Sequence, residues 1–204
     1  AQRREWPEPM AEEAFYGRAG DIVRAIEPHT EADPVALLVN TLACFGNAVG
    51  RTVHGVAEAD RHGCNVFSVM VGETAKGRKG SSHGHVHELF KRIDPGWADA
   101  RIMGGLSSGE GLIWAVRDPI EKQEAVKEKG KRTGDYETVI VDEGEDDKRL
   151  LVYEPEFAGV LRVMARDGNT LSAVIRQAWD TGDLRTMVKN NPAMATGAHI
   201  SILG

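Results

Sequence analysis

The segment that decides the fold is residues 65–82, NVFSVMVGETAKGRKGSS. Its first seven residues form a nearly continuous apolar run rich in β-branched side chains, as in a strand buried on both faces of a parallel sheet. A loop rich in glycine and serine follows at once, and residues 82–92 then have a helical pattern. A buried strand, a glycine-rich loop and a helix in direct succession predict an α/β fold with a mostly parallel sheet.

The loop in this segment has the parts of a phosphate-binding loop. Such a loop needs small residues so that backbone N–H groups face phosphate oxygens, a lysine for the β- and γ-phosphates, and a hydroxyl for Mg²⁺. The candidate residues for ATP and Mg²⁺ are Gly72, Gly77, Arg78, Lys79, Gly80, Ser81 and Ser82, with Lys79 on the phosphates and Ser81 or Ser82 on the metal.

The spacing departs from the usual G-x-x-x-x-G-K-[ST] pattern. Arg78 stands between Gly77 and Lys79, and Gly80 separates Lys79 from Ser81. The alternative to a phosphate loop is therefore a basic loop that only turns the chain. The position between an apolar run and a helix favours the phosphate loop, because a helix N-terminus attracts anions.

Nucleotide hydrolysis also needs an acidic residue that completes the Mg²⁺ shell and activates water, and a strand end is the expected place for it. Residues 149–153 (RLLVY) precede Glu154 and Glu156 and lead directly into a helical pattern. We expect this strand to lie beside residues 65–71, with Glu154 as a metal ligand and Glu154 or Glu156 in catalysis. The runner-up is Asp142, which follows the apolar run 139–141. For each acid, the alternative is a helix cap or a turn.

The chain divides into two expected regions. Residues 1–50 are predicted to form an N-terminal helical region, in which Asp33 caps and Pro34 begins a buried helix. Residues 51–204 are predicted to form the core, incomplete at its C-terminal end because the last apolar strand runs to the final residue. Further helices are expected near 111–117, 156–166 and 171–179, and further strands near 101–105, 184–188 and 198–203.

Two polar stretches of the core region are harder to place. Residues 118–138 are charged and almost free of large apolar groups, so we expect a mobile insertion or a solvated helix. After it, the runs 138–142 and 149–153 flank the acidic sequence GEDDK, which is typical of a hairpin. Residues 60–63 (DRHG) are expected to form a turn.

The composition is ordinary for a soluble globular protein, with 41% hydrophobic and 27% charged residues. A net charge of −6 argues against a domain that coats nucleic acid through a basic surface. No apolar run reaches the roughly 20 residues of a membrane helix, and residues 1–17 lack a secretory apolar stretch. We therefore expect a cytoplasmic location and no membrane contact.

The cysteines and histidines, which often bind metals in proteins, are predicted to have structural roles here. Cys44 and Cys64 lie in apolar segments outside any paired motif, so both are expected to be small core thiols. His83 and His87 are four residues apart and His85 lies between them. No third ligand adjoins the pair, so a solvated helix face is expected rather than a metal site.

Four stretches of the chain resemble a family of bacterial proteins with a predicted RecA-like P-loop ATPase domain, which often occur in plasmid, integrative-element and phage genes. These stretches are 71–82 (VGETAKGRKGSS), 104–119 (GGLSSGEGLIWAVRDP), 149–161 (RLLVYEPEFAGVL) and 184–204 (LRTMVKNNPAMATGAHISILG). The resemblance runs from about residue 15 to the end. Residues 118–138 fit the family poorly.

The resemblance implies a RecA-like sheet behind an N-terminal helical region. It also implies a helicase-like, replication-associated ATPase that contacts DNA in the full-length protein and forms a homo-oligomeric ring. In RecA-like ATPases the activating glutamate often follows the strand after the phosphate-loop helix, and Glu110 stands at that place. A helix cap is the alternative for Glu110.

Two rival functions remain open. A nucleotide-dependent switch or assembly module would bind without turnover, and the irregular lysine spacing favours it. A small-molecule kinase is suggested by the Lys-Gly-Ser ending of the loop, and it would need a basic lid over the acceptor. Residues 118–138 supply Lys122, Lys127, Lys129, Lys131 and Arg132 for such a lid.

Overall fold

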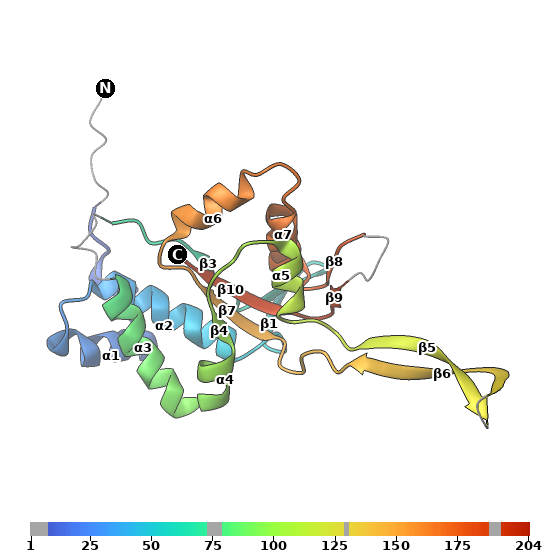
Figure 1. Cartoon of the computed structure of the whole chain (residues 1–204). Coiled ribbons are helices and arrows are strands. Elements are labelled where there is room, and N and C mark those ends of the chain that lie inside the picture. Colours follow the sequence, from blue (N-terminus) through green and yellow to red (C-terminus); the bar gives the residue numbers. More distant parts are fainter. Residues whose placement is uncertain (1–7, 73–78, 129–130, 188–192) are drawn as a thin grey trace.

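The computed structural model describes residues 8–72, 79–128, 131–187 and 193–204. At its centre lies a four-stranded parallel sheet in the order β3-β10-β7-β4 (Figure 1). The strands are β3 (Phe67–Ser68), β10 (His199–Leu203), β7 (Arg149–Tyr153) and β4 (Ile102–Met103). The prediction of an α/β fold with a parallel sheet is confirmed.

Helices cover both faces of this sheet. One face packs against α2 (Pro34–Ala48), α3 (Lys79–Ile93) and α4 (Pro95–Ala100), and α1 (Gly17–Ile26) packs on α2. The other face packs against α5 (Gly109–Trp114), α6 (Phe157–Met164) and α7 (Leu171–Asp180). The helix predictions are confirmed, and Asp33 caps α2 through a bond from Val35 N to its Oδ1 of 2.8 Å.

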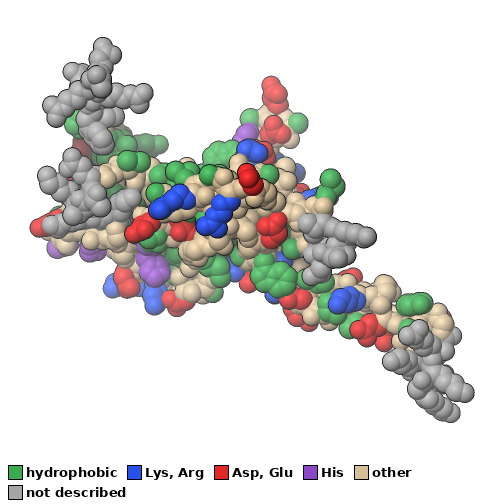
Figure 2. Space-filling view, turned by 45° about the horizontal axis from the view of Figure 1, so that its top comes forward, with side chains coloured by type: hydrophobic (Ala, Val, Ile, Leu, Met, Phe, Trp, Pro, Cys, Tyr) green, Lys and Arg blue, Asp and Glu red, His purple; other side chains and the backbone are tan. Residues whose placement is uncertain are grey.

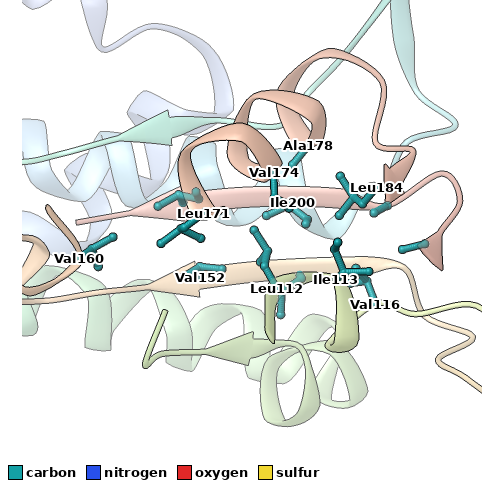
Figure 3. Close-up of a cluster of buried hydrophobic side chains, with 14 residues drawn as sticks. Leu112, Ile113, Val116, Val152, Val160, Leu171, Val174, Ala178, Leu184 and Ile200 are labelled. Atoms are coloured by element: carbon teal, nitrogen blue, oxygen red, sulfur yellow. The ribbon is translucent and has the colours of Figure 1, made fainter. Parts of the chain in front are cut away.

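Strand β7 connects the two hydrophobic cores because its side chains alternate between the faces. Leu150 and Val152 join the cluster under α5 and α7 (Figure 3), and Leu151 joins the cluster under α2 and α3. All three are almost completely buried. Residues 149–153 thus form the predicted strand, and it is covered on both faces.

The order of the strands corrects one prediction. Strand β10 lies between β3 and β7, pairing Ile202 with Phe67 on one side and with Val152 on the other. Residues 149–153 therefore do not lie directly beside residues 65–71. Only Phe67–Ser68 of residues 65–71 form a strand, and both residues are half-buried, while Val69 and Val71 beyond the strand are exposed, which contradicts the expectation of a strand buried on both faces.

A buried amide holds α2 against the sheet. Asn47 Nδ2 donates to Leu150 O at 3.0 Å and to His199 O at 2.9 Å, and its Oδ1 accepts from Trp97 Nε1 at 2.9 Å. A second buried group, the Arg101 guanidinium, donates to Arg149 O and Ala115 O and pairs with Glu145 at 3.0 Å. Such partners offset the free-energy cost of burying polar groups.

The largest correction concerns residues 118–138. They do not form the solvated helix that was one of the two alternatives, because β5 (Ile120–Glu128) and β6 (Lys131–Asp142) pair antiparallel in an arm that projects from the body (Figures 1 and 2). The predicted hairpin between 138–142 and 149–153 is also wrong, since β6 pairs with β5 and β7 belongs to the main sheet. The sequence 136–142 alternates poorly but is rich in β-branched residues, which favour strands.

Short elements complete the described chain. Residues 60–63 form a strand rather than the predicted turn, since β2 (Asp60–Gly63) pairs with β1 (His54–Ala57) and the chain turns at Glu58 with φ 54°. Strands β8 (Leu184–Arg185) and β9 (Met194–Ala195) pair with each other. The 3₁₀ helices are η1 (Glu12–Ala14) and η2 (Glu27–His29). None of the helices in the described part of the chain has the length and apolarity to span a bilayer.

Candidate functional site

The carboxyl ends of all four strands meet at one edge of the sheet because the strands are parallel. Backbone bonds hold the ends together: Met70 N donates to Gly204 O at 2.8 Å, and Glu154 N donates to Leu203 O at 2.7 Å. The chain leaves β3 toward α3 on one face of the sheet and leaves β7 toward α6 on the opposite face. Such a switch point at the carboxyl edge is where open α/β sheets bind ligands.

Glu154 lies at the centre of this edge, directly after β7. Its side chain is half-buried, and Oε1 accepts a hydrogen bond from the backbone N–H of Leu106 in the loop after β4. A β-carbon at Gly104 in the same loop would lie 2.9 Å from Tyr153 O, so only glycine fits this close approach. The carboxylate is therefore held in a fixed position between two strand ends, with its remaining lone pairs available to a ligand.

The first turn of α3 distinguishes the two candidate hydroxyls. Ser82 is fully buried, and Asn40 Nδ2 of α2 donates to its Oγ at 3.3 Å. Ser81 is exposed, as is Gly80. The hydroxyl that can reach a metal at the surface of the edge is therefore that of Ser81, and Ser82 instead ties α3 to α2.

A ring stack joins the start of α3 to the end of β7. The rings of His83 and Tyr153 lie parallel, with centroids 3.8 Å apart and planes 12° apart. His83 Nδ1 lies 3.1 Å from Asn40 Oδ1, and an amide oxygen only accepts, so Nδ1 carries the proton. Burial, and secondly the nearby His87, lowers the pKa of His83 to about 4.

His83 is thus a neutral, buried residue, and its predicted place on a solvated helix face is wrong. The cause is tertiary: Tyr153 comes from a strand 70 positions away in the chain. His85 is exposed, as expected. Among the described residues no group of three or more His, Cys, Asp or Glu side chains could hold a metal ion. Cys44 is a buried thiol, as predicted, and burial raises its pKa to about 12.

Two predicted phosphate-loop residues lie outside the described residues. They are Gly77 and Arg78, and for Lys79 the structure describes only its backbone, at the first position of α3. Gly72 lies four residues after the end of β3 and is exposed. Helix α3 has 15 residues, so its N-terminus presents unpaired N–H groups and a partial positive charge at the edge where the loop ends.

The other candidate acids lie in three different settings. Glu156 is exposed immediately before α6, and its side chain makes no capping bond. Glu110 lies in the first turn of α5 and accepts from Thr170 Oγ1 at 3.0 Å, while Ser108 Oγ caps that helix through Gly111 N. This bond to Thr170 favours a structural contribution from Glu110.

Asp142 lies at the base of the arm, away from the parallel sheet. Its carboxylate accepts from Arg117 Nε at 2.9 Å and from Gly144 N at 2.8 Å. The backbone hydrogen bond from Gly144 and the Arg117 guanidinium both lower the pKa of Asp142. Desolvation opposes this shift in part. Asp142 is therefore already bound to Arg117 and Gly144 in a turn, whereas Glu154 lies at the end of a strand of the parallel sheet.

The carboxylate of Glu154 and the hydroxyl of Ser81 are oxygen groups of the kind that Mg²⁺ prefers. The ion is usually held by one or two carboxylates together with phosphate oxygens and waters rather than by a complete protein cage. Glu154 provides a carboxylate and Ser81 a hydroxyl at the same edge of the sheet. Three residues that hold this edge together, Asn40, Leu106 and Tyr153, were not foreseen. Of these, only Asn40 gives a sequence signal, as a polar residue within an apolar helix.

A scan against protein-family models and a search of curated proteins both find no match for this chain. The feature that bears on function is the geometry of the carboxyl edge. That geometry combines the N-terminus of a long helix, an exposed hydroxyl in its first turn, and a carboxylate directly after β7 that accepts a hydrogen bond from Leu106 N.

Proposed function

We propose that the chain binds a nucleoside triphosphate with Mg²⁺ at the carboxyl edge of the sheet and hydrolyses it. The observation that carries the proposal is the stack of His83 on Tyr153, which brings the first turn of α3 next to the strand that ends in Glu154. A phosphate site needs a helix N-terminus and an acidic strand end within reach of one ligand. The RecA-like architecture belongs to the same proposal.

Each residue has a definite role in this proposal. Backbone N–H groups from Gly72 to Ser81 bind phosphate oxygens, and Lys79 neutralises charge on the β- and γ-phosphates. Ser81 and Glu154 hold Mg²⁺, which when bound offsets the charge of the phosphates and orients them. Glu156, exposed at the same strand end, orients the attacking water, with Glu110 as the second candidate.

The kinase alternative loses its main support. A lid must close over the carboxyl edge, but the arm leaves the body beside Lys148, directly before the amino end of β7. Lys148 Nζ donates to Asp118 Oδ1 at 2.8 Å, and Arg117 pairs with Asp142, so the base of the arm is fixed at that opposite edge. In Figure 1 the arm extends away from the carboxyl ends of the strands.

The resemblance of the sequence to the ATPase family adds three parts to the proposal. These are a helicase-like role in replication, contact with DNA and assembly into a ring. A non-hydrolysing switch would use the same phosphate site. The two functions differ in turnover, so phosphate release measured with and without single-stranded DNA distinguishes them. Release that DNA stimulates supports the motor, and tight binding without release supports the switch.

The direct test is ATP titration by calorimetry with Lys79→Ala and Lys76→Ala variants. Lys79 is the first residue of α3, at the proposed phosphate site, whereas Lys76 precedes the helix in the sequence. Losing charge-assisted hydrogen bonds should weaken ATP binding roughly tenfold to a hundredfold in Lys79→Ala and much less in Lys76→Ala. Unchanged binding in Lys79→Ala would remove the basis of the proposal.

A second pair of variants tests the acid. Glu154→Gln keeps the shape of the side chain and its bond from Leu106 N but loses the charge that holds the metal. We expect ATP hydrolysis to fall by about a hundredfold or more. The matched control is Glu143→Gln, an exposed acid at the base of the arm, which should leave hydrolysis unchanged.

A further inference from the structure

One face of the β5–β6 arm carries an exposed apolar stripe. Side chains two residues apart on a strand point to the same face, so Tyr136, Thr138 and Ile140 share one face of β6. Tyr136 is 67% exposed and Ile140 is 49% exposed. Between them, Gln123 Nε2 of β5 donates to Thr138 Oγ1 at 2.7 Å, so β5 contributes to the same face. A single copy of the chain therefore leaves an aromatic and an aliphatic side chain uncovered on this face.

Positive charge is concentrated at the end of the arm farthest from the body (Figure 1). There the register pairs Lys127 with Arg132 and Glu128 with Lys131, so three of these four residues are cations. Like charges directly opposite each other in a ribbon are destabilising. An acidic partner at the far end would relieve the repulsion between Lys127 and Arg132.

Negative charge predominates from the middle of the arm to its base. The segment that begins at the last residue of β6, residues 142–147 (DEGEDD), contains five acids, and Asp146 within it is exposed. Between the far end and this segment, the arm has four acids and one cation, which are Glu121, Glu124, Asp135, Glu137 and Lys122. Two arms that lie side by side in opposite directions therefore have complementary charges.

A second copy of the chain matches the apolar stripe as well as the charges. If two arms stack face to face about a two-fold axis through Thr138, each Tyr136 meets the partner's Ile140, because both residues are two positions from Thr138. The same register brings Arg132 of each arm level with position 144 of the other, within the acidic segment, because both positions are six residues from Thr138. A two-fold contact of this kind closes on itself with two copies.

Nucleic acid suits the arm less well than a second copy does. A phosphate backbone would be attracted to the far end, but the four acids nearer the body would repel it, and the whole chain has a net charge of −6. A ribbon of two strands is marginal in water and gains stability when a further layer covers an apolar face. Stacking of two arms supplies that layer to both of them.

We propose that the β5–β6 arm is a dimerisation element, through which two copies of the chain associate face to face with their arms antiparallel. The inference goes beyond the proposed function, because it needs neither the nucleotide nor the ring. A contact between two ribbons is smaller than the roughly 1,600 Å² of a standard interface. We therefore expect a weak dimer, with a dissociation constant on the order of 10–100 µM.

Sedimentation equilibrium of the whole chain at concentrations from about 1 to about 500 µM measures this dissociation constant. Tyr136→Ser should weaken the dimer about tenfold or more, because buried tyrosines contribute strongly to protein interfaces. The matched control is Tyr16→Ser, since Tyr16 lies before α1, outside the arm, and is 81% exposed. This control should leave the dissociation constant unchanged.

A charge swap tests the antiparallel arrangement. Lys131→Glu at the far end and Asp146→Lys at the base should each weaken self-association about fivefold, because every dimer contains the contact twice. An equimolar mixture of the two variants should regain the affinity of the unmodified chain. In the mixed dimer, each far end again meets an opposite charge at the base of the other arm.

Three results would overturn the proposal. The first is a chain that stays monomeric over the whole concentration range. The second is a dimer that Tyr136→Ser does not weaken, or a mixture of the charge variants that associates no more tightly than each variant alone. The third is arm-dependent binding of a labelled double-stranded DNA probe by a monomeric chain, which would assign the arm to nucleic acid. Circular dichroism checks that every variant keeps its fold.

Discussion

Strand β7 and the end of β6 (residues 136–142) are both rich in residues that favour strands, but they are stabilised in different ways. Leu150, Leu151 and Val152 of β7 are buried between two layers of helices. In the arm, Tyr136, Ile140 and Val141 remain exposed on a two-stranded ribbon. Ribbons of two strands are marginal in water because they bury little apolar surface.

The pairing within the arm also contains a destabilising contact. Its register sets Glu124 directly opposite Glu137, and like charges in that position are destabilising. One side-chain bond, from Gln123 Nε2 to Thr138 Oγ1 at 2.7 Å, compensates in part. We therefore expect burial to make β7 necessary for the fold, and we expect the core to depend little on the arm.

The largest expected effect comes from truncating a buried side chain in β7. Leu151→Ala should lower the free energy of unfolding by about 2–5 kcal/mol, since it opens a cavity between β7 and α2. The matched control, Ile140→Ala in the arm, should cost less than about 1 kcal/mol because Ile140 is 49% exposed. Urea unfolding followed by circular dichroism measures both, and equal costs would contradict the distinction between core and arm.

The next largest effect is a loss of stability at low pH, caused by the buried side chain of His83. The pKa of His83 falls from 6.5 to about 4 on folding, so below about pH 6.5 the unfolded chain takes up a proton that the folded chain does not. The free energy of unfolding should therefore fall as the pH is lowered from about 6.5 to about 4, by up to about 3 kcal/mol, and be unaffected above that window.

Urea unfolding of the unmodified chain and of His83→Gln between about pH 7.5 and about pH 4.5 measures this effect. The variant should lose less stability in acid. His199, whose pKa burial also lowers, contributes in the same direction in both proteins. The arm has no histidine between positions 120 and 142, so the NMR signals of its backbone amides should not follow the titration of a histidine. Identical pH profiles would contradict the assignment to His83.

A smaller effect is expected from removing the arm. Ile120 pairs with Asp142 at its base, so a short glycine linker can join these residues in place of 121–141. The free energy of unfolding should change by less than about 1 kcal/mol, because the arm forms a separate local unit. As a control, Arg117→Ala in the intact chain removes the bond to Asp142 without shortening the arm. Loss of cooperative unfolding on deletion would show that the core depends on the arm.

The smallest effect concerns charge within the arm. Glu124→Lys replaces the repulsion with Glu137 by attraction and should stabilise the arm by about 0.2–1 kcal/mol. Amide hydrogen exchange near Gln123 should slow by up to about fivefold. Glu121→Lys, opposite the apolar Ile140, is the control and should change exchange little. A slowdown of equal size in the control would assign the effect to net charge rather than to the pairing.

Local signals in the sequence predicted most of the elements of the core. The helix that Asp33 caps and Pro34 begins and the apolar strand before Glu154 are both found where the sequence predicts them. Capping and burial patterns depend on residues a few positions apart, so a single sequence contains them. The arm was missed because its charged sequence has no buried face, and pairing between two strands determines its structure.

The sequence by itself determined that a strand, a glycine-rich loop and a helix follow one another between residues 65 and 93, and that Glu154 ends an apolar strand. Only the tertiary structure decided that β10 lies between β3 and β7, that Leu106 N holds the carboxylate of Glu154, and that His83 is buried against Tyr153. These features join residues far apart in the chain, and no local propensity encodes such contacts. They form only when burial of both faces of the sheet selects one arrangement of the strands.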